Sequence, residues 1–313
     1  MLTVKGGFIM ENFRYQLSDP HASERAQALY RFLISLKGRG ILSGQQETPR
    51  DQTHGEELAY IERVSGRLPA ILGLDYIEND FSGVNTRARA WERRGGIVSI
   101  CWHWGIPPYG VGYPSSKESV DMAELLTEGT PLYQGMLDNI DAVAKALMEL
   151  DRANIPVIWR PLHEFDGAWF WWGKGGPEAF CKLWRLMYDR FTKHHGLHNL
   201  IWVLGYAKVE EGWYPGDEYV DIIGADEYTE GIHEALYKKL LTVTDKSMPI
   251  CLHENGPIPN PRELVEKKVD WCWFLTWHTT HIHDQNTPEY IQEIYHDPYV
   301  VTLQNMGEFW SEL

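Results

Sequence analysis

Eight short apolar stretches recur along the chain, and they constrain its fold more than any other feature. Several are continuous runs of β-branched or aliphatic residues, a pattern typical of strands that are buried on both faces of a parallel sheet. We therefore predict eight strands, at residues 41–43, 70–74, 97–102, 157–161, 200–204, 220–224, 249–252 and 271–276.

Helical patterns lie between these stretches. Residues 137–150 and 180–191 repeat apolar side chains every three or four positions, which predicts two amphipathic helices. A third helix is predicted before the first strand, from the spacing of Leu29, Phe32, Leu33 and Leu36. Strands that alternate with helices predict an α/β fold with a parallel sheet, either doubly wound or closed. Eight strands favour the closed form, a single (β/α)₈ TIM barrel.

The length of 313 residues suits one such barrel, which needs roughly 250 residues and commonly carries loop insertions. No repeat, low-complexity run or Pro/Ser-rich linker divides the sequence. We expect one catalytic domain over residues 1–313, with an N-terminal helical extension at about 20–38. Residues 104–132 are too long for a simple connection, so we expect extended βα loops that form a cleft over the site.

The balance of charge bears on the partners of the chain. A net charge of −15 argues against nucleic acid or an anionic membrane, since phosphate contacts would work against the overall field. A neutral substrate fits this charge best. The oligomeric state stays open, and we expect a monomer.

Aromatic residues are abundant, with 14 Trp and 16 Tyr, and several fall in predicted connections, as in Trp169-Phe170-Trp171-Trp172. One interpretation is that these side chains close a large core. The other is a carbohydrate site, because the apolar faces of sugar rings stack on flat amphipathic side chains.

Cysteines and the N-terminus give little information about the compartment. Cys101, Cys181, Cys251 and Cys272 include no C-x-x-C pair, so we expect no disulfide framework. The first ten residues contain no apolar stretch long enough for a signal peptide or a transmembrane span. We expect either a cytoplasmic protein or a secreted enzyme whose signal has been removed.

Polar residues at the ends of the predicted strands are the candidates for chemistry, because a (β/α)₈ barrel builds its active site at the carboxyl ends of its strands. Glu164 follows the fourth strand and Glu254 follows the seventh. They are 90 residues apart (254 minus 164), which matches three βα units of about 30 residues each. The two glutamates should therefore face one another across the barrel mouth.

Two facing carboxylates are the pair of groups that most glycoside hydrolases use for catalysis. A separation of about 5–5.5 Å indicates a retaining mechanism and a wider one indicates inversion; the sequence leaves this open. Taken singly, each glutamate could instead pair with a neighbouring arginine or cap a helix. The pair is more specific, because burying two carboxylates in one aromatic mouth is costly without a use.

The segment Arg160-Pro-Leu-His-Glu-Phe-Asp-Gly-Ala-Trp-Phe-Trp-Trp-Gly173 resembles the signature of glycoside hydrolase family 26, whose commonest activity is endo-β-1,4-mannanase. The resemblance continues at residues 199–203, 224–228, 253–254 and 275–277, and covers the chain from about 40 to 277. It implies a (β/α)₈ barrel with catalytic glutamates after strands four and seven.

Carried over residue by residue, the resemblance implies a retaining mechanism. Glu164 would be the general acid/base and Glu254 the nucleophile. Tyr228 would donate a hydrogen bond to Glu254. His163 would bond the sugar or orient a carboxylate, and Trp169 would line the cleft near the leaving group.

Other residues would contact the sugar. Trp277 would form the floor under the sugar at the cleavage point, and His103 would contact the sugar on its non-reducing side. Asp75 and Trp172 complete the expected substrate-binding set. One departure from the family is visible, since Phe165-Asp166 stands where members often have Met-Asn. This change adds a carboxylate near the leaving-group side.

The same roles have a physical basis that does not depend on the family. Glu164 must be protonated to act as an acid, and apolar walls such as Leu162 and Phe165 would favour that form. Glu254 must stay ionised, and a phenol donor such as Tyr228 stabilises a carboxylate.

Other constellations are weaker. His278, His281 and His283 form a cluster in which a metal is conceivable, but neither H-E-x-x-H nor a second set of ligands supports it. We expect no metal and no cofactor.

The sequence therefore predicts an endo-β-1,4-mannanase that acts on mannan, glucomannan or galactomannan by double displacement. Alternatives in the same family are a β-1,3-1,4-glucanase, a β-1,3-xylanase and an exo-acting enzyme that releases mannobiose. Alternatives from other classes are a carbohydrate-binding barrel without catalysis and a metal-dependent barrel hydrolase.

Overall fold

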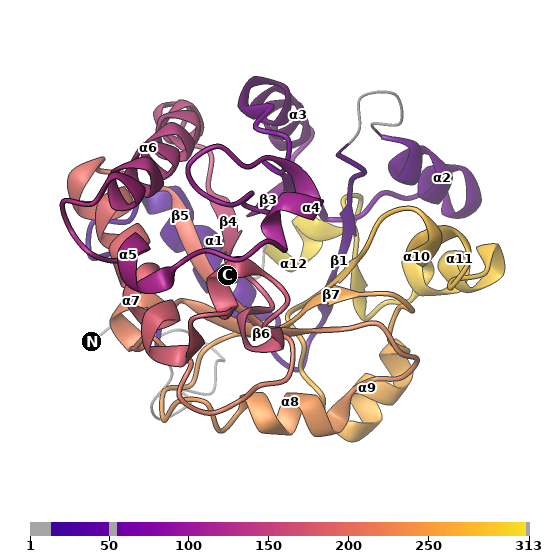
Figure 1. The fold of residues 1–313 in the computed structure, drawn as a ribbon. Coiled ribbons are helices and arrows are strands. Elements are labelled where there is room, and N and C mark those ends of the chain that lie inside the picture. Colours follow the sequence, from indigo (N-terminus) through magenta and orange to yellow (C-terminus); the bar gives the residue numbers. More distant parts are fainter. Residues whose placement is uncertain (1–13, 50–54, 311–313) are drawn as a thin grey trace, which may run out of the picture.

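Eight parallel strands close into a barrel in the computed structural model, which describes residues 14–49 and 55–310 (Figure 1). Consecutive strands pair with one another, and the first strand also pairs with the eighth, which completes the closure. The predicted (β/α)₈ barrel is confirmed. The strands are β1 Ile41–Gln46, β2 Ile71–Asp75, β3 Ile97–Trp102, β4 Val157–Pro161, β5 Leu200–Tyr206, β6 Ile222–Glu227, β7 Ile250–Asn255 and β8 Trp273–Thr276.

The strand boundaries differ from the prediction in an informative way. β3 and β4 have the predicted bounds, whereas β1, β6 and β7 each continue three residues past the predicted ends at 43, 224 and 252. The added residues are mostly polar, among them Gln46, Asp226 and Glu254. Glu254 therefore lies within β7 instead of in the loop after it, so the barrel wall itself fixes its backbone.

Helices cover the outside of the barrel (Figure 1). The two helices predicted between strands are present as α6 and α7. Every residue between β5 and β6 is described, and there a single 3-10 turn at Asp217–Tyr219 takes the place of an α-helix. The main helices are α1 Glu24–Ser35, α2 Glu56–Ser65, α3 Phe81–Arg93, α6 Pro131–Arg152, α7 Gly176–Asp189, α8 Glu234–Leu240, α9 Pro261–Lys267 and α11 Pro288–His296.

The amino-terminal half of the barrel is filled by an apolar core. α1, which lies behind the strands in Figure 1, contributes Leu29, Phe32 and Leu33 to this apolar core. The short strand β9 Val300–Val301 pairs with the start of β1, and Phe32 contacts Trp310 of α12 Met306–Trp310. The strands supply the other side chains of this layer, among them Leu42, Ile71, Ile97, Ile158, Ile201 and Ile222. At the carboxyl end of the barrel, polar side chains take the place of these apolar ones, so the candidates for chemistry lie at that end.

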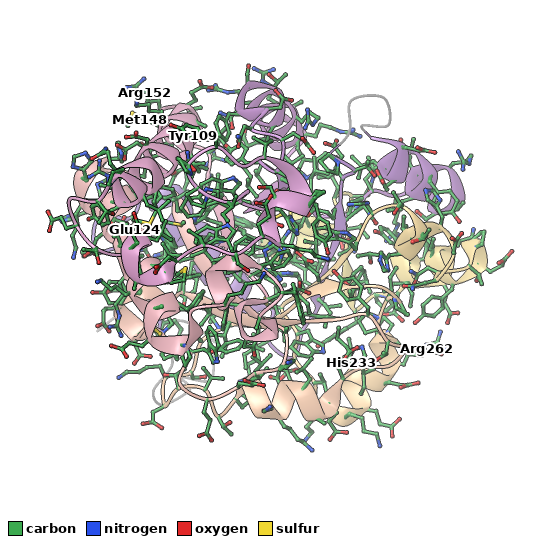
Figure 2. The ribbon with its side chains drawn as sticks, viewed as in Figure 1. Tyr109, Glu124, Met148, Arg152, His233 and Arg262 are labelled. Carbon is green, nitrogen blue, oxygen red and sulfur yellow. The ribbon has the colours of Figure 1, made fainter. Side chains whose placement is uncertain are left out.

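Side chains also fill the gap that the ribbons leave at the centre of the barrel (Figure 2). Arg160 contacts Gln46, Ser99 and His253 across the barrel, and all four residues are buried. The barrel is thus a packed core and not a channel, as is usual for this architecture. Among the described residues, no helix is both long enough and apolar enough to cross a membrane.

The long connection after β3 lies over one side of the barrel mouth. It contains two short helices, α4 Gly112–Ser116 and α5 Met122–Leu125, before α6 begins. The ring of Tyr113 lies 5.7 Å from that of His103 and 6.0 Å from that of Phe170. These contacts place the connection beside the predicted site, as we predicted from its length.

Candidate active site

Arg160 is the centre of the polar layer in the upper half of the barrel. It belongs to β4 and is fully buried. Its Nε donates to Ser99 Oγ at 2.9 Å, one terminal nitrogen donates to Glu254 Oε1 at 2.9 Å, and the other donates to Gln46 Oε1 at 2.9 Å. A buried cation needs such partners, because each unpaired N–H would cost the full desolvation penalty.

Glu254 is held from both oxygens. Arg160 binds Oε1, and the hydroxyl of Tyr228 donates to Oε2 at 2.8 Å. Burial raises the pKa of Glu254 above its ordinary value, and the guanidinium and the phenol offset only part of that effect by stabilising the carboxylate. Each oxygen thus has a donor fixed on another strand or loop, so the carboxylate has one orientation.

A second layer of residues supports Arg160 and Glu254 from behind. His253 Nδ1 lies 2.5 Å from Asp226 Oδ1, and its Nε2 lies 3.2 Å from an Arg160 nitrogen. Arg160 can only donate, so His253 Nε2 accepts and its Nδ1–H donates to Asp226. Burial, followed by the charge of Arg160, lowers the pKa of His253, which agrees with this neutral tautomer.

Glu164 occupies a strained turn immediately after β4. Its backbone φ is +53°, and that of Leu162 is +51°. Residues other than Gly rarely adopt this left-handed conformation. Its backbone N–H donates to the Gly205 carbonyl at 2.8 Å, which ties the turn to β5. Burial and then the charge of Glu254 raise the pKa of Glu164 to about 7. A proton on Glu164 near neutral pH is what a general acid requires.

Trp169 stands beside this acid. Its indole N–H donates to Glu164 Oε2 at 2.8 Å, and 37% of the residue is exposed. A side chain at Gly167 would approach the indole ring to 2.3 Å, so glycine there allows the indole to keep this position. Trp169 can therefore both orient the acid and offer an aromatic face to a ligand.

His103 and His163 form a hydrogen-bonded pair in the mouth. Their Nε2 atoms lie 3.1 Å apart, and His103 Nδ1 lies 2.5 Å from Asp75 Oδ2. Burial alone would lower the pKa of His103, but Asp75 outweighs it and raises that pKa, whereas burial and His103 lower the pKa of His163. The proton shared by the pair therefore belongs to His103.

Trp277 lies at the opposite side of the same mouth. Its backbone N–H donates to Asn255 O at 2.8 Å, and its ring lies 5.7 Å from that of His103. The residue is partly exposed, as a residue that stacks on a ligand must be. The fold thus brings Glu164, Glu254, His103, His163, Trp169, Tyr228 and Trp277 together at the carboxyl ends of β3 to β8.

Four members of the expected substrate-binding set are buried: the paired His103 and His163 described above, and also Trp172 and Asp75. Trp172 is fully buried, stacks on Phe170, and donates its N–H to the His163 carbonyl at 2.8 Å. Asp75 is buried, and its carboxylate accepts from His103 and from the backbone N–H of Ile77. Direct contact of Trp172 or Asp75 with substrate is at odds with these positions. Both residues support the site from behind, because their polar atoms are already engaged with the protein.

Sequence reasoning gave no role to Arg160, Gln46, Asp226 or His253. A signal was present for Arg160, because a charge inside an apolar strand needs buried partners. The partners themselves come from three other strands, and spacing along the chain does not reveal which polar residues meet.

The histidine cluster after β8 does not converge on a point. His281 packs on the Tyr228 ring at 4.9 Å and His283 on the Tyr60 ring at 4.4 Å. Within the described part of the chain, the groups of side chains that could hold a metal ion are Asp75–Cys101–His103 and Asp226–His253–Glu254, and none includes His278, His281 or His283. In both groups a hydrogen bond of 2.5 Å already joins the histidine to the aspartate.

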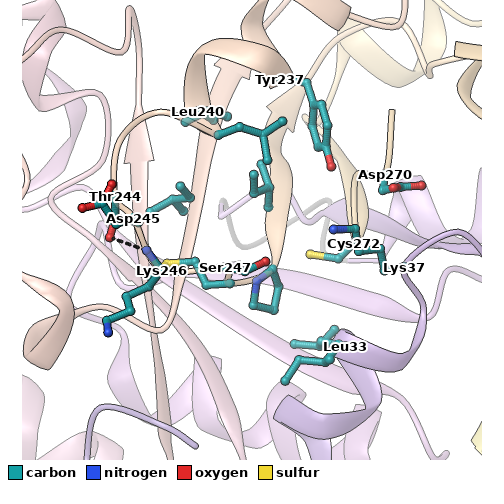
Figure 3. A pocket seen from close by; sticks show the side chains of 16 residues that line it. Leu33, Lys37, Tyr237, Leu240, Thr244, Asp245, Lys246, Ser247, Asp270 and Cys272 are labelled. Carbon is teal, nitrogen blue, oxygen red and sulfur yellow. Dashed lines mark hydrogen bonds between the residues drawn. The ribbon is translucent and has the colours of Figure 1, made fainter. Parts of the chain in front are cut away.

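A separate pocket of about 160 Å³ lies at the other end of the barrel, between α1, α8 and the starts of β7 and β8 (Figure 3). Leu33, Tyr237, Leu240 and Cys272 are among the residues that line it. It contains none of the predicted site residues. The paired carboxylates and the partly exposed Trp169 and Trp277 belong to the carboxyl end alone.

The model of glycosyl hydrolase family 26 matches residues 18–305. A mannan endo-1,4-beta-mannosidase from Thermothelomyces thermophilus is 36% identical over 95% of this chain and 64% of its own length. Mannan endo-1,4-beta-mannosidase B from Piromyces sp is 33% identical over 94% and 54%, respectively. The chain thus spans between about half and two thirds of the length of these relatives.

Solved structures show the same likeness. The GH26-CBM35 beta-(1,4)-mannanase from Podospora anserina superimposes with a TM-score of 0.88 at 34% identity, over 96% of this chain and 70% of that one. A beta-mannanase from a symbiotic protist of the termite Reticulitermes speratus, complexed with a gluco-manno-oligosaccharide, has a TM-score of 0.85 at 29% identity, over 94% and 98%.

Proposed function

The chain belongs to glycosyl hydrolase family 26, and from that premise we propose that it hydrolyses β-1,4-mannosidic bonds in mannan, glucomannan or galactomannan with retention of configuration. The observation that carries the proposal is the contrast between two carboxyls in one mouth. Glu254 has a hydrogen-bond donor on each oxygen, whereas burial and the neighbouring charge raise the pKa of Glu164 to about 7. One is equipped to be a nucleophile and the other an acid.

The first chemical step follows from this division. A Glu254 oxygen attacks the anomeric carbon while the bond from that carbon to the leaving oxygen breaks. Glu164 gives its proton to the leaving oxygen, so the departing sugar carries a hydroxyl group. The product of the step is a sugar joined to Glu254 through an ester, which no longer bears a charge.

The second step reverses these roles. Loss of the Glu254 charge removes one of the causes that raise the pKa of Glu164, so Glu164 can serve as a base. It takes a proton from water, the water oxygen attacks the anomeric carbon, and the bond to Glu254 breaks. Glu254 leaves as a carboxylate, which Arg160 and Tyr228 are placed to receive.

Substrate contacts would come from the exposed part of the mouth. Trp169 and Trp277 offer partly exposed aromatic faces on opposite sides, and the buried, hydrogen-bonded pair His103 and His163 lies between them. Sugar rings stack on such faces, and a few fixed polar groups orient them. The relatives named as mannan endo-1,4-beta-mannosidases favour mannan as the polymer and internal cleavage as the mode.

The test is hydrolysis of a panel of mannan, lichenan, xylan and β-1,3-xylan with sizing of the products. We expect a range of oligosaccharides from mannan and little release from the others. Mannobiose as the single early product from mannohexaose would contradict endo action, and preferred release from lichenan or β-1,3-xylan would contradict the substrate.

Two further arms separate the classes of mechanism. Glu254→Ala should abolish hydrolysis, and EDTA should leave the rate unchanged. Hydrolysis that survives Glu254→Ala contradicts the mechanism, and loss of activity in EDTA indicates a metal-dependent hydrolase. Binding of mannan without hydrolysis by the unmutated chain would indicate a carbohydrate-binding barrel.

A further inference from the structure

Asp166, two residues after the acid, has an unusual set of partners. Its carboxylate accepts the backbone N–H of Ala207 at 2.7 Å, of Lys208 at 3.0 Å and of Glu210 at 3.1 Å. The side chain is buried, with 3% of the residue exposed. Hence the carboxylate that departs from the family pattern does not face the leaving group. It binds the segment that follows β5, named here the 207–210 loop.

This loop needs an external support. Val209, in its middle, has a φ of +58°, and a β-branched residue is strained in this left-handed region. Such a conformation persists only where the surroundings fix it. Asp166 binds the amide groups on both sides of Val209, and the charge of its carboxylate would strengthen each of these hydrogen bonds.

The same contacts act on the acid, because Asp166 lies in the turn that carries it. The N–H of Glu164 donates to Gly205 O, two residues before the loop. Phe165 stacks on Phe180 at 4.1 Å and packs against Tyr206 at 4.7 Å. The turn that holds Glu164 is thus bound to the end of β5 through Glu164 and Phe165, the two residues immediately before Asp166.

We propose that Asp166 is a positioning residue for the general acid, which it aligns by binding the 207–210 loop to the turn that carries Glu164. The inference rests on the proposed function and assigns it a further residue. It predicts that loss of Asp166 impairs proton donation to the leaving group more than it impairs the other parts of the reaction.

A comparison of leaving groups isolates proton donation. Departure of a sugar from mannopentaose needs the proton of Glu164, whereas departure of 2,4-dinitrophenolate from 2,4-dinitrophenyl β-mannobioside does not. In a retaining enzyme kcat/KM reports the first step for both probes. Asp166→Ala should lower kcat/KM on mannopentaose on the order of tenfold to a hundredfold, the effect of a small misplacement. It should leave kcat/KM on the aryl glycoside within about twofold.

Asp166→Asn provides a variant with a smaller perturbation. Its side chain keeps one accepting oxygen and places an NH₂ group against a backbone N–H. The loss of kcat/KM should therefore be smaller than in Asp166→Ala and equally confined to mannopentaose.

Asp221→Ala is the matched control, because Asp221 is also buried and accepts backbone N–H groups, from Ser18 and Trp202, at the other end of the barrel. Any loss in that variant should be the same on both probes.

Equal losses on both probes in either Asp166 variant would overturn the inference, since they would indicate a general effect on folding. Unchanged kcat/KM on mannopentaose in both variants would overturn it as well. An unmutated chain that hydrolyses neither probe would overturn the proposed function, and this inference with it.

Discussion

Glu164 and Glu254 are chemically identical side chains, and the atoms that each contacts are what separate their proposed roles. Glu254 meets a guanidinium and a phenol, whereas Glu164 meets one indole N–H and the field of Glu254. These partners set the pKa values of the two glutamates, and the pH dependence of the reaction should follow from those pKa values. Activity should require Glu254 ionised and Glu164 protonated, which gives a bell-shaped profile of kcat/KM.

Tyr228→Phe tests the acid limb of that profile. The phenol stabilises the ionised form of Glu254, so its loss should raise the pKa of Glu254 and move the acid limb to higher pH. We also expect kcat/KM at the optimum to fall on the order of a hundredfold, the usual cost of one fixed donor. Tyr214→Phe is the control, because that hydroxyl bonds Asp217 away from the mouth. An unmoved acid limb in Tyr228→Phe would contradict the assignment.

Trp169→Phe tests the basic limb. The indole N–H stabilises ionised Glu164, so its removal should raise the pKa of Glu164 above its value of about 7. The basic limb of kcat/KM should therefore move to higher pH, and activity should extend into the alkaline range. A limb that stays in place or moves to lower pH would show that Trp169 does not act on the acid.

At the scale of elements, capping residues set where helices begin. Thr130 accepts the N–H of Tyr133 at 3.0 Å, and Pro131 occupies the first turn of α6. Thr130→Ala should lower the free energy of unfolding by about 1 kcal/mol in urea titrations and leave kcat/KM unchanged. Thr130→Ser keeps the hydroxyl and should match the unmutated chain. Equal stability of the Ala and Ser variants would mean that this cap contributes nothing.

The sequence predicted the strands and helices well where the pattern of apolar residues matches the pattern of burial. β3 and β4 end where their apolar runs end, and α6 and α7 show the expected stripe. The prediction was too short for β7 because His253 and Glu254 are polar although they lie in a strand. Hydropathy cannot detect a strand whose side chains enter a polar barrel mouth.

The site was predictable in part for the same reason. Counting βα units was enough to place Glu164 and Glu254 in one mouth, and resemblance supplied Tyr228 and Trp169. The contacts of Asp166 were not predictable, because its partners are backbone amides of another connection. Trp172 was expected at the surface of the cleft, but its indole packs beneath His163.

In the molecule as a whole, the two ends of the barrel differ in what they bury. α1 and the apolar layer close one end, and the other end buries charges that the reaction needs. Such charges cost stability. The folded state holds a Glu164 with a pKa of about 7, above the ordinary value of 4.5, so ionising it is unfavourable and stability falls as pH rises between these values.

Glu164→Gln should release this cost. The amide resembles the protonated acid, so the variant should unfold with the same free energy as the unmutated chain near pH 4.5. At pH 8 it should be more stable by on the order of 2–3 kcal/mol. Urea unfolding at both pH values measures the difference. A stability difference that does not depend on pH would contradict the raised pKa of Glu164.

The proposed mechanism requires a covalent bond between Glu254 and the sugar. It is tested most directly by inactivating the enzyme with a 2-deoxy-2-fluoro-β-mannobiosyl fluoride and locating the adduct by peptide mass spectrometry. The fluorine slows both steps, and the fluoride leaving group restores the first, so the intermediate accumulates. We expect one added disaccharide on the peptide that contains Glu254. A label on Glu164 or Asp226, or turnover with inverted configuration and no label, would contradict this mechanism.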